Sequence, residues 1–486
     1  MKKIQNFYVD RNKSIIEINK DLMFFIENFS NKQELSELLN WISVKTKISV
    51  KSLKLDTQKF VFDRFVNIKG KFNNSFLKKK IFYDSIKFIT IFYYIRLFSK
   101  KIKKQYNCEL IVDDISNNTS PDRFEKLNKL CKTIFVSTIK LDKKYNTFLF
   151  RKYMNCALDK NITNNLIFYL FLFFKTFYCS FKIGSNLFPL ISRLILFYLK
   201  YETVFRSINS KFLIQERHYN TSAIKNEIFH KHGGKICSSI QKNILQINGI
   251  GMYIYSDILF SLGEKTASMV EKLGGEVKKI LPVGSLFMER NLFDRKFDND
   301  FFSYDMLVFA SNHTGNFHSG YNSYHSDYYL HFEWIKKFSK EHPNFKIGIK
   351  LKKILKDRKV KEIFSNTKNV KFLVDKSSDW SDTYFLGKKA KSLCTWSSTL
   401  GFEFIGYGKE CYFLDPGRRN ISFLPNEEYL TLAKVKEYNE FRDKVLKLIK
   451  GEKNHEIIKN KKNFCFNSND VSEKILKNFR NFENNF

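Results

Sequence analysis

The sequence predicts an α/β protein with two Rossmann-like domains, preceded by a helical, basic and aromatic-rich N-terminal portion. Three observations support this fold class. The chain has 486 residues, enough for two or three domains of about 150 residues each. From residue 106 on, short apolar runs alternate with amphipathic segments of about 12 residues, a pattern typical of parallel sheets. A charged, aromatic connector at 286–304 interrupts this alternation once and thereby separates two domains.

Residues 1–105 form the helical portion of this prediction. The segment Ser30 to Gln33 fits a capping box in front of the amphipathic run ELSELLNWI. Residues 76–105 mix aromatic residues and lysines along one helix. Such a helix either packs one face on a core or lies on an anionic membrane.

Residues 106–290 form the first predicted α/β domain, on the acceptor side of the site discussed below. Its strands are expected in the runs CELIVDD, TIFVSTI, KFLIQER, KICSSIQ and YSDILFS. An apolar insertion at 160–200 contains two runs, 166–174 and 187–199. A spanning helix needs about 20 mostly uncharged residues, and neither run is that long. A buried helical pair is therefore favoured over a membrane-surface element, and both over a true span.

Residues 300–430 form the second predicted α/β domain. Its strands are expected at 305–311, 345–351, 370–375, 391–396 and 410–415. The remainder, 431–486, is predicted to be a helical, lysine-rich tail.

The net charge of the chain indicates which classes of partner it can bind. With 84 Lys and Arg against 49 Asp and Glu, the net charge is +35, which favours nucleic acid, anionic lipid or a phosphorylated ligand. A genome rich in A and T would also raise the lysine content. The lysines are spread along the whole chain, and no zinc module or recognition helix is evident, which argues against nucleic acid. Eight cysteines without a CxxC pair, and no apolar leader at the N-terminus, predict a reduced, cytoplasmic protein.

The most informative segment is CTWSSTLGFEFIGYGKECYFLD (394–415). Ser397, Ser398 and Thr399 follow a predicted strand and begin a predicted helix. Helix N-termini offer free N–H groups and a positive dipole end, which suit a phosphate. Glu403 lies one turn further along the same helix face, where a carboxylate can accept hydrogen bonds from ribose. An ordinary helix cap would also place hydroxyl groups here.

This segment resembles the donor-binding element of GT-B glycosyltransferases that build capsule, lipopolysaccharide and other surface polysaccharides, including Kdo and sialic-acid transferases. Related elements occur in CDP-glycerol glycerophosphotransferases and nucleotide-sugar 2-epimerases. YSDILFSLG (255–263), followed by LPVGS (281–285), resembles the end of a GT-B N-terminal domain. The resemblance covers about 211–425. It departs from the family where Lys242, instead of histidine, follows Gln241, and where Lys352-Lys353 replaces a His-Pro pair after Lys350.

The resemblance implies two domains that face a cleft, with the nucleotide on the C-terminal one. It implies that Ser397, Ser398 and Thr399 contact phosphate and that Glu403 contacts ribose. The implied activity moves a sugar from a nucleotide-activated donor to a polysaccharide or lipid-linked glycan, with the protein at the inner face of the cytoplasmic membrane.

Further site residues are expected where strands end, because α/β folds bind ligands there. Ser311, Asn312, His313 and Thr314 follow the first strand of the second domain and are expected to contact the donor. Lys350, together with Arg290, is expected to offset charge on the leaving nucleotide. The base that activates the acceptor hydroxyl is expected among Asp113 and Asp114, Glu216 with His218, and Asp257, with Glu216 preferred.

No metal or cofactor is expected beyond the nucleotide sugar itself. Five of the nine histidines lie within 313–342, but their spacing matches no standard ligand pattern. Three rival functions remain. A nucleotide-sugar 2-epimerase would need no acceptor, a glycerophosphotransferase would use CDP-glycerol, and a non-catalytic basic protein would bind nucleic acid or anionic lipid.

Overall fold

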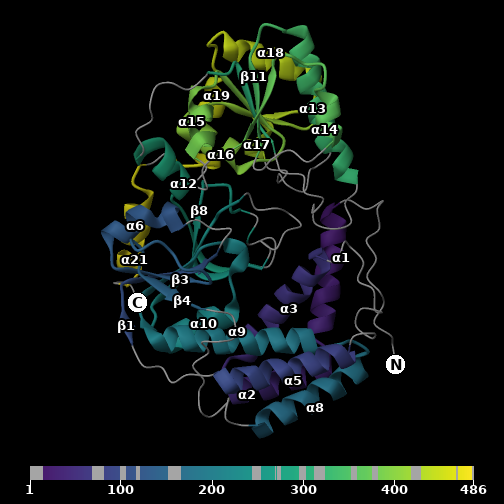
Figure 1. Ribbon diagram of the computed structural model, residues 1–486, viewed down its shortest axis with the longest axis vertical. Coiled ribbons are helices and arrows are strands. Elements are labelled where there is room, and N and C mark those ends of the chain that lie inside the picture. Colours follow the sequence, from purple (N-terminus) through teal and green to yellow (C-terminus); the bar gives the residue numbers. More distant parts are fainter. Residues whose placement is uncertain are drawn as a thin grey trace.

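The structure is a computed structural model, shown in Figure 1. It describes residues 15–67, 81–98, 105–116, 121–150, 166–243, 253–268, 270, 275–294, 303–310, 323–351, 358–374, 381–417, 428–466 and 469–483. The predicted α/β architecture is confirmed, because the described residues form two larger sheets in which all strands are parallel.

The first sheet has seven strands in the order β4-β3-β2-β6-β7-β8-β9. Its strands are β2 (Leu110–Ile115), β3 (Thr133–Ser137), β4 (Thr147–Leu149), β6 (Phe212–Gln215), β7 (Ile236–Ile240), β8 (Tyr255–Ser261) and β9 (Glu276–Pro282). Two short strands, β1 (Tyr106–Asn107) and β5 (Ile208–Asn209), pair separately. All five predicted runs coincide with strands inside this sheet, namely β2, β3, β6, β7 and β8, because each is a short and largely buried apolar segment.

Helices cover both faces of this sheet (Figure 1). One face packs on α9 (Phe188–Ser207) and α10 (Ala223–Lys231). The other packs on α6 (Glu125–Leu130) and the C-terminal helix α21 (Val471–Glu483). The ring of Phe479 in α21 stacks on Phe212 of β6 at 4.7 Å between centroids. The end of the chain therefore returns from the second domain to complete the first.

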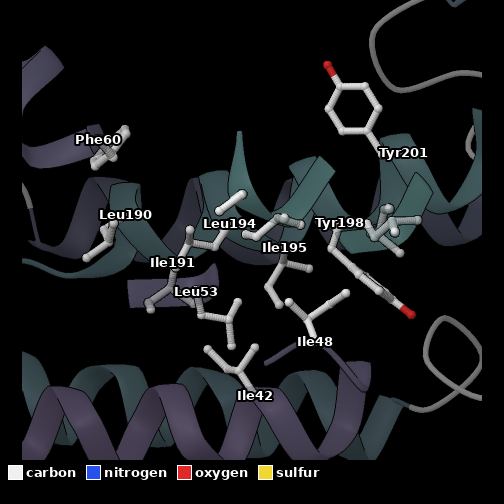
Figure 2. Close-up of a cluster of buried hydrophobic side chains, with 14 of the residues drawn as sticks. Ile42, Ile48, Leu53, Phe60, Leu190, Ile191, Leu194, Ile195, Tyr198 and Tyr201 are labelled. Carbon is white, nitrogen blue, oxygen red and sulfur yellow. The ribbon is translucent and has the colours of Figure 1, made fainter. Parts of the chain in front are cut away.

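The N-terminal portion is a helical layer against α9. It contains α1 (Ile15–Ser30), α2 (Gln33–Thr46), α3 (Val50–Asn67), α5 (Ile81–Phe98) and, from the insertion, α8 (Leu166–Ile183). In Figure 2, Leu194 and Ile195 of α9 lie near Ile42 and Leu53 of this layer, whereas Tyr201 points to the other side of α9. The predicted helical pair at 160–200 is thus α8 and α9.

The predicted capping box at Ser30 is wrong. Ser30 is the last residue of α1, and its hydroxyl donates to the carbonyl oxygen of Glu27 at 2.9 Å. Helix α2 begins at Gln33 without a side-chain cap. A serine hydroxyl can also donate to a backbone carbonyl of the preceding turn at the end of a helix. The same residue pattern is therefore compatible with a helix C-terminus as well as with an N-terminus.

The second sheet has six strands in the order β12-β11-β10-β13-β14-β15. They are β10 (Met306–Phe309), β11 (Ile347–Leu351), β12 (Val370–Val374), β13 (Ser392–Thr395), β14 (Cys411–Leu414) and β15 (Lys434–Val435). The strand β15 lies inside the tail that was predicted to be helical. The helices of this half are α13 (Ser323–Glu341), α14 (Arg358–Ile363), α15 (Ser381–Lys389), α16 (Thr399–Tyr407), α17 (Glu428–Thr431), α18 (Tyr438–Ile449), α19 (His455–Lys459) and α20 (Lys461–Phe464).

The carboxyl edge of the first sheet meets the second domain. Just after β8, Leu262 accepts a hydrogen bond from the amide of Phe466 at 2.9 Å, and the amide of Glu264 donates to Lys462 at 3.0 Å. Ser285, between β9 and the short helix α12 (Leu286–Met288), contacts Glu403 of α16. The polar strand ends of the first domain therefore lie on the side that faces the C-terminal half.

Candidate functional site

A buried ion cluster lies where β2 ends. Lys225 of α10 is fully buried and places its ammonium 2.7 Å from the carboxylate of Asp113 and 3.2 Å from that of Asp114. The Lys225 ammonium also lies 4.7 Å from the ring centre of Tyr201. Despite the cost of burial, the nearby lysines lower the pKa of Asp113 to about 2. The cluster therefore holds charged side chains in fixed positions at the carboxyl end of β2.

Asp114 is the exposed member of this cluster. Its side chain is 19% exposed, and its backbone has φ of +68°, which is unusual for a residue other than glycine. The register of β2 against β3 shifts between Val112 and Ile115, so Asp114 lies within an irregularity of the strand. The positive φ and the shift in register occur together at Asp114, and strained backbone of this kind clusters at functional sites.

Glu216, the preferred base from sequence, is surrounded by cations. Its carboxylate is 1% exposed and lies 2.7 Å from Arg123, 2.6 Å from Arg217 and 3.4 Å from Lys242. The Arg123 guanidinium is buried as well. Three cations therefore surround a carboxylate that is almost fully buried, which leaves it poorly placed to reach an acceptor hydroxyl. The geometry gives Glu216 a more evident role in holding Arg217 and Lys242 at the sheet edge.

His218 and Lys242 lie beside each other at the ends of β6 and β7. The Nδ1 atom of His218 accepts the backbone N–H of Lys242 at 3.2 Å, so this nitrogen carries no proton. Burial lowers the pKa of His218 to about 3, which keeps the ring neutral at pH 7. Burial also lowers the pKa of the Lys242 ammonium to about 8. The lysine at this position thus has a pKa closer to neutral pH than an ordinary lysine.

A pocket of about 200 Å³ opens next to Asp114. Its walls come from four elements: α3, α9, the end of β2 and the turn at His218–Asn220 that leads into α10. Charged, aromatic and small polar side chains line it, namely Asp56, Lys59, Phe60, Asp114, Arg193, Leu194, Phe197, Tyr219, Asn220, Thr221 and Ser222. The helical N-terminal portion therefore builds one wall of a pocket at the ligand-binding edge of the first sheet.

Asp257 is not brought to this edge. It is the third residue of β8, level with Cys237 of β7, whose backbone N–H it accepts at 2.8 Å. Its carboxylate also bonds to His230 at 2.8 Å and Lys278 at 2.9 Å. At about 3.3 Å per residue, this level is roughly 10 Å before the level of Glu216 along the strands.

The start of α16 forms the second part of the candidate site. Ser397, Ser398 and Thr399 are partly exposed and follow the carboxyl end of β13. The hydroxyl of Ser398 accepts the amide of Leu400 at 3.3 Å and so caps the helix. Gly408, with φ of +93°, closes the helix at its other end. The predicted strand, hydroxyl cap and helix are all present, whereas phosphate contact stays a prediction.

Glu403 is buried within α16 and reaches the other domain. Its carboxylate accepts the hydroxyl of Tyr384 at 2.7 Å and that of Ser285, on the segment that follows β9. Burial raises the pKa of Glu403 to about 7. Contact between Glu403 and ribose stays a prediction. It would require a carboxylate that already accepts hydrogen bonds from Tyr384 and Ser285.

The remaining predicted residues lie apart or outside the described part of the chain. Ser311, Asn312, His313 and Thr314 lie outside the described residues. Lys350 is buried at the end of β11, and its ammonium donates to the carbonyl of Leu351 at 3.2 Å. Arg290 pairs with Glu125 at 3.3 Å, next to α6.

Among the described residues, no group of three or more His, Cys, Asp or Glu side chains could hold a metal ion. Within the same part of the chain, no helix is long and apolar enough to cross a membrane.

The sequence did not single out Lys59, Asp56, Arg193 or Lys225. The hydrogen-bond partners of Asp56 lie more than 160 positions away in the sequence, and the two carboxylates that pair with Lys225 lie more than 110 positions away. A lysine placed in an otherwise apolar helix face was the only local signal for Lys225, since such a residue needs a buried partner.

No protein-family model and no curated protein matches the sequence. Similar solved structures include MnaA of S. aureus with UDP (11% identity, 77% of this chain, 97% of the other, TM-score 0.44). They also include UDP-GlcNAc 2-epimerase from Neisseria meningitidis bound to UDP-GlcNAc (12% identity, covering 76% of this chain and 100% of the other, TM-score 0.42). A glycosyltransferase from Rickettsia africae is similar as well (13% identity, covering 79% of this chain and 100% of the other, TM-score 0.41).

Proposed function

We propose that the protein is a glycosyltransferase that moves a sugar from a nucleotide-activated donor to a polysaccharide or lipid-linked glycan, at the inner face of the cytoplasmic membrane. The observation that carries the proposal is the hydroxyl-rich start of α16 at the carboxyl end of a parallel strand. Partly exposed hydroxyls at the N-terminal end of a helix, where the helix dipole is positive, suit a phosphate. The pocket beside Asp114, at the edge of the other sheet, suits the acceptor.

In the proposed reaction, the donor phosphate binds at Ser397, Ser398 and Thr399. The acceptor hydroxyl enters the pocket and loses its proton to a carboxylate, for which Asp114 is better exposed than Glu216. The acceptor oxygen forms a bond to the anomeric carbon as the bond from that carbon to the phosphate oxygen breaks. The nucleotide leaves with the bonding electrons, and the N-terminus of α16 stabilises the charge that it gains.

The test is a thermal-shift screen of the full chain with CMP, CDP, UDP, GDP and dTDP. A nucleotide at 100 times its Kd should stabilise the protein by about 2.7 kcal/mol. The variant S397A/T399A keeps the Ser398 cap and is expected to lose the shift. The variant S365A removes an exposed hydroxyl of the same domain and should respond like wild type.

The nucleotide that binds would also identify the donor class. CMP would indicate a Kdo or sialic-acid donor, CDP a glycerol donor, and UDP a hexosamine donor or an epimerase. Turnover of a UDP-sugar without any acceptor would favour the epimerase. If no nucleotide shifts the Tm, or if S397A/T399A shifts as wild type does, the proposed donor site is wrong.

A further inference from the structure

Exposed apolar side chains are concentrated on two neighbouring helices, α5 and α8. Eleven of the eighteen large apolar residues that are exposed in the described part of the chain belong to these two helices. They are Phe82, Tyr83, Ile86, Ile89 and Tyr93 of α5, and Ile167, Leu170, Phe171, Phe174, Tyr178 and Phe181 of α8. We call these eleven residues the aromatic face. Proteins that act alone in water rarely expose so much apolar surface in one place.

The spacing along α8 puts its exposed residues on a single side. At 3.6 residues per turn, the six positions from Ile167 to Phe181 fall within an arc of about 100°. The opposite side holds Phe168, Leu172 and Cys179, which are buried against the helical layer. Helix α8 is therefore apolar on both sides. One side packs on the protein core, and the other exposes aromatic rings and aliphatic side chains to solvent.

The two helices form one surface. The ring of Phe92 in α5 stacks on Tyr169 in α8 at 4.4 Å between centroids, and Phe88 lies 6.4 Å from Phe173. Both helices lie at the end of the molecule farthest from the second sheet, with α8 outermost (Figure 1). A flat or gently curved partner can thus reach the aromatic face without meeting the candidate site.

The charged side chains on the two helices that carry the aromatic face are mostly positive. Helix α8 contains Lys175 and Lys182, both exposed, and no acidic residue. On α5, Lys87 is exposed, and the single acid, Asp84, bonds to Asn186 at 2.8 Å. The sequence adds lysines directly before α5 at 78–80 and shortly after it at 100, 101, 103 and 104. Rings flanked by lysines fit a surface whose interior is apolar and whose headgroups are negative.

We propose that the aromatic face docks the protein on an anionic lipid surface, with the rings inserted among the acyl chains and the lysines at the headgroups. This inference rests on the membrane location in the proposed function and identifies the surface that would meet the lipid, but it does not depend on nucleotide binding. It agrees with the finding that no described helix is suited to cross a membrane, since both helices would lie in the plane of the interface. A second copy of the chain is the competing occupant.

The test is flotation of the full chain with vesicles of phosphatidylcholine alone or mixed with phosphatidylglycerol. Wild type should float with the mixed vesicles, and less at high salt because exposed charges are screened. The variant F171S/F174S/F181S should bind at least about tenfold more weakly, because each ring loses apolar burial. The variant K175Q/K182Q should bind about 25-fold more weakly, since each lysine near the surface contributes about fivefold.

Matched controls come from other surfaces. Phe24 of α1 is 69% exposed outside the aromatic face, and F24S should bind as wild type does. K447Q/K450Q removes two exposed lysines of the second domain and should also leave binding unchanged. The nucleotide-induced Tm shift should persist in F171S/F174S/F181S, which separates lipid binding from the donor site and reports folding. The proposal is wrong if wild type binds neither kind of vesicle, or if F171S/F174S/F181S floats with the mixed vesicles as wild type does. A dimer in sedimentation equilibrium that only the face variant dissociates would assign the face to a second copy instead.

Discussion

At the scale of single residues, the first domain is organised by buried charges. Lys225 is fully buried between α9, α10 and β2, and two carboxylates and one aromatic ring surround its ammonium. Such a cluster gains little stability over an apolar core, but it is costly to break from one side. It fixes the position of Asp114, and thereby the shape of the pocket edge on which the proposed acceptor would bind.

Replacing Lys225 by methionine should therefore destabilise the protein by about 3–5 kcal/mol, because Asp113 remains buried without its cation. Unfolding in urea, followed by fluorescence, measures the loss. Adding D113N to K225M should restore part of the stability, because the uncompensated charge is then removed. If K225M alone unfolds at the wild-type urea concentration, the cluster does not hold the first domain together.

At the scale of elements, α3 positions the start of α10. Asp56 of α3 accepts the amides of Ala223 at 3.2 Å and Ile224 at 3.0 Å, together with the hydroxyl of Ser222 at 2.5 Å. Nearby, the ammonium of Lys59 donates to the carbonyl of Tyr253 at 2.9 Å. A helix of the N-terminal portion thus supplies the cap for a helix of the first α/β domain, which makes these two parts one structural unit.

The variant D56A should cost about 1–2 kcal/mol, the usual loss when an N-terminal cap is removed. D56N should lie closer to wild type, because an amide oxygen still accepts from the helix and burial already raises the pKa of the carboxylate. The control is K51A on the same helix, which breaks an exposed ion pair with Glu276 and should change stability by less than about 1 kcal/mol. Equal effects of D56A and K51A would contradict the capping role.

The same examples explain how far the sequence alone could predict this molecule. Strands such as β6 and β13 were predictable because a short apolar run followed by turn residues is a local signal. The helix start at Ser397–Thr399 was predictable for the same reason. The pair of Asp56 with Ser222 was not, since the two residues are 166 positions apart. Nor could the amphipathic pattern of α21 say that Phe479 returns to Phe212 of the first sheet.

At the scale of the whole molecule, Glu403 links the two domains through its contacts with Tyr384 of the second domain and Ser285 between the domains. Burial is the main reason that the pKa of this carboxyl is raised to about 7, from 4.5 in a free chain. Between these two values the folded protein holds a proton that the unfolded chain has lost. The stability that Glu403 contributes is therefore present below about pH 4.5 and is lost as the pH rises through 7.

The difference in unfolding free energy between wild type and E403Q isolates this effect, because all other titrating groups are common to both proteins. It should fall by about 3 kcal/mol from pH 4.5 to pH 8, at 1.36 kcal/mol for each unit of pKa change. Trp396, which is fully buried in the second domain, provides the fluorescence signal for urea unfolding of that half. A difference that stays constant with pH would mean that the Glu403 carboxyl keeps an ordinary pKa in the folded protein. It would then be solvated rather than buried at the contact between the domains, and so free to meet a ribose.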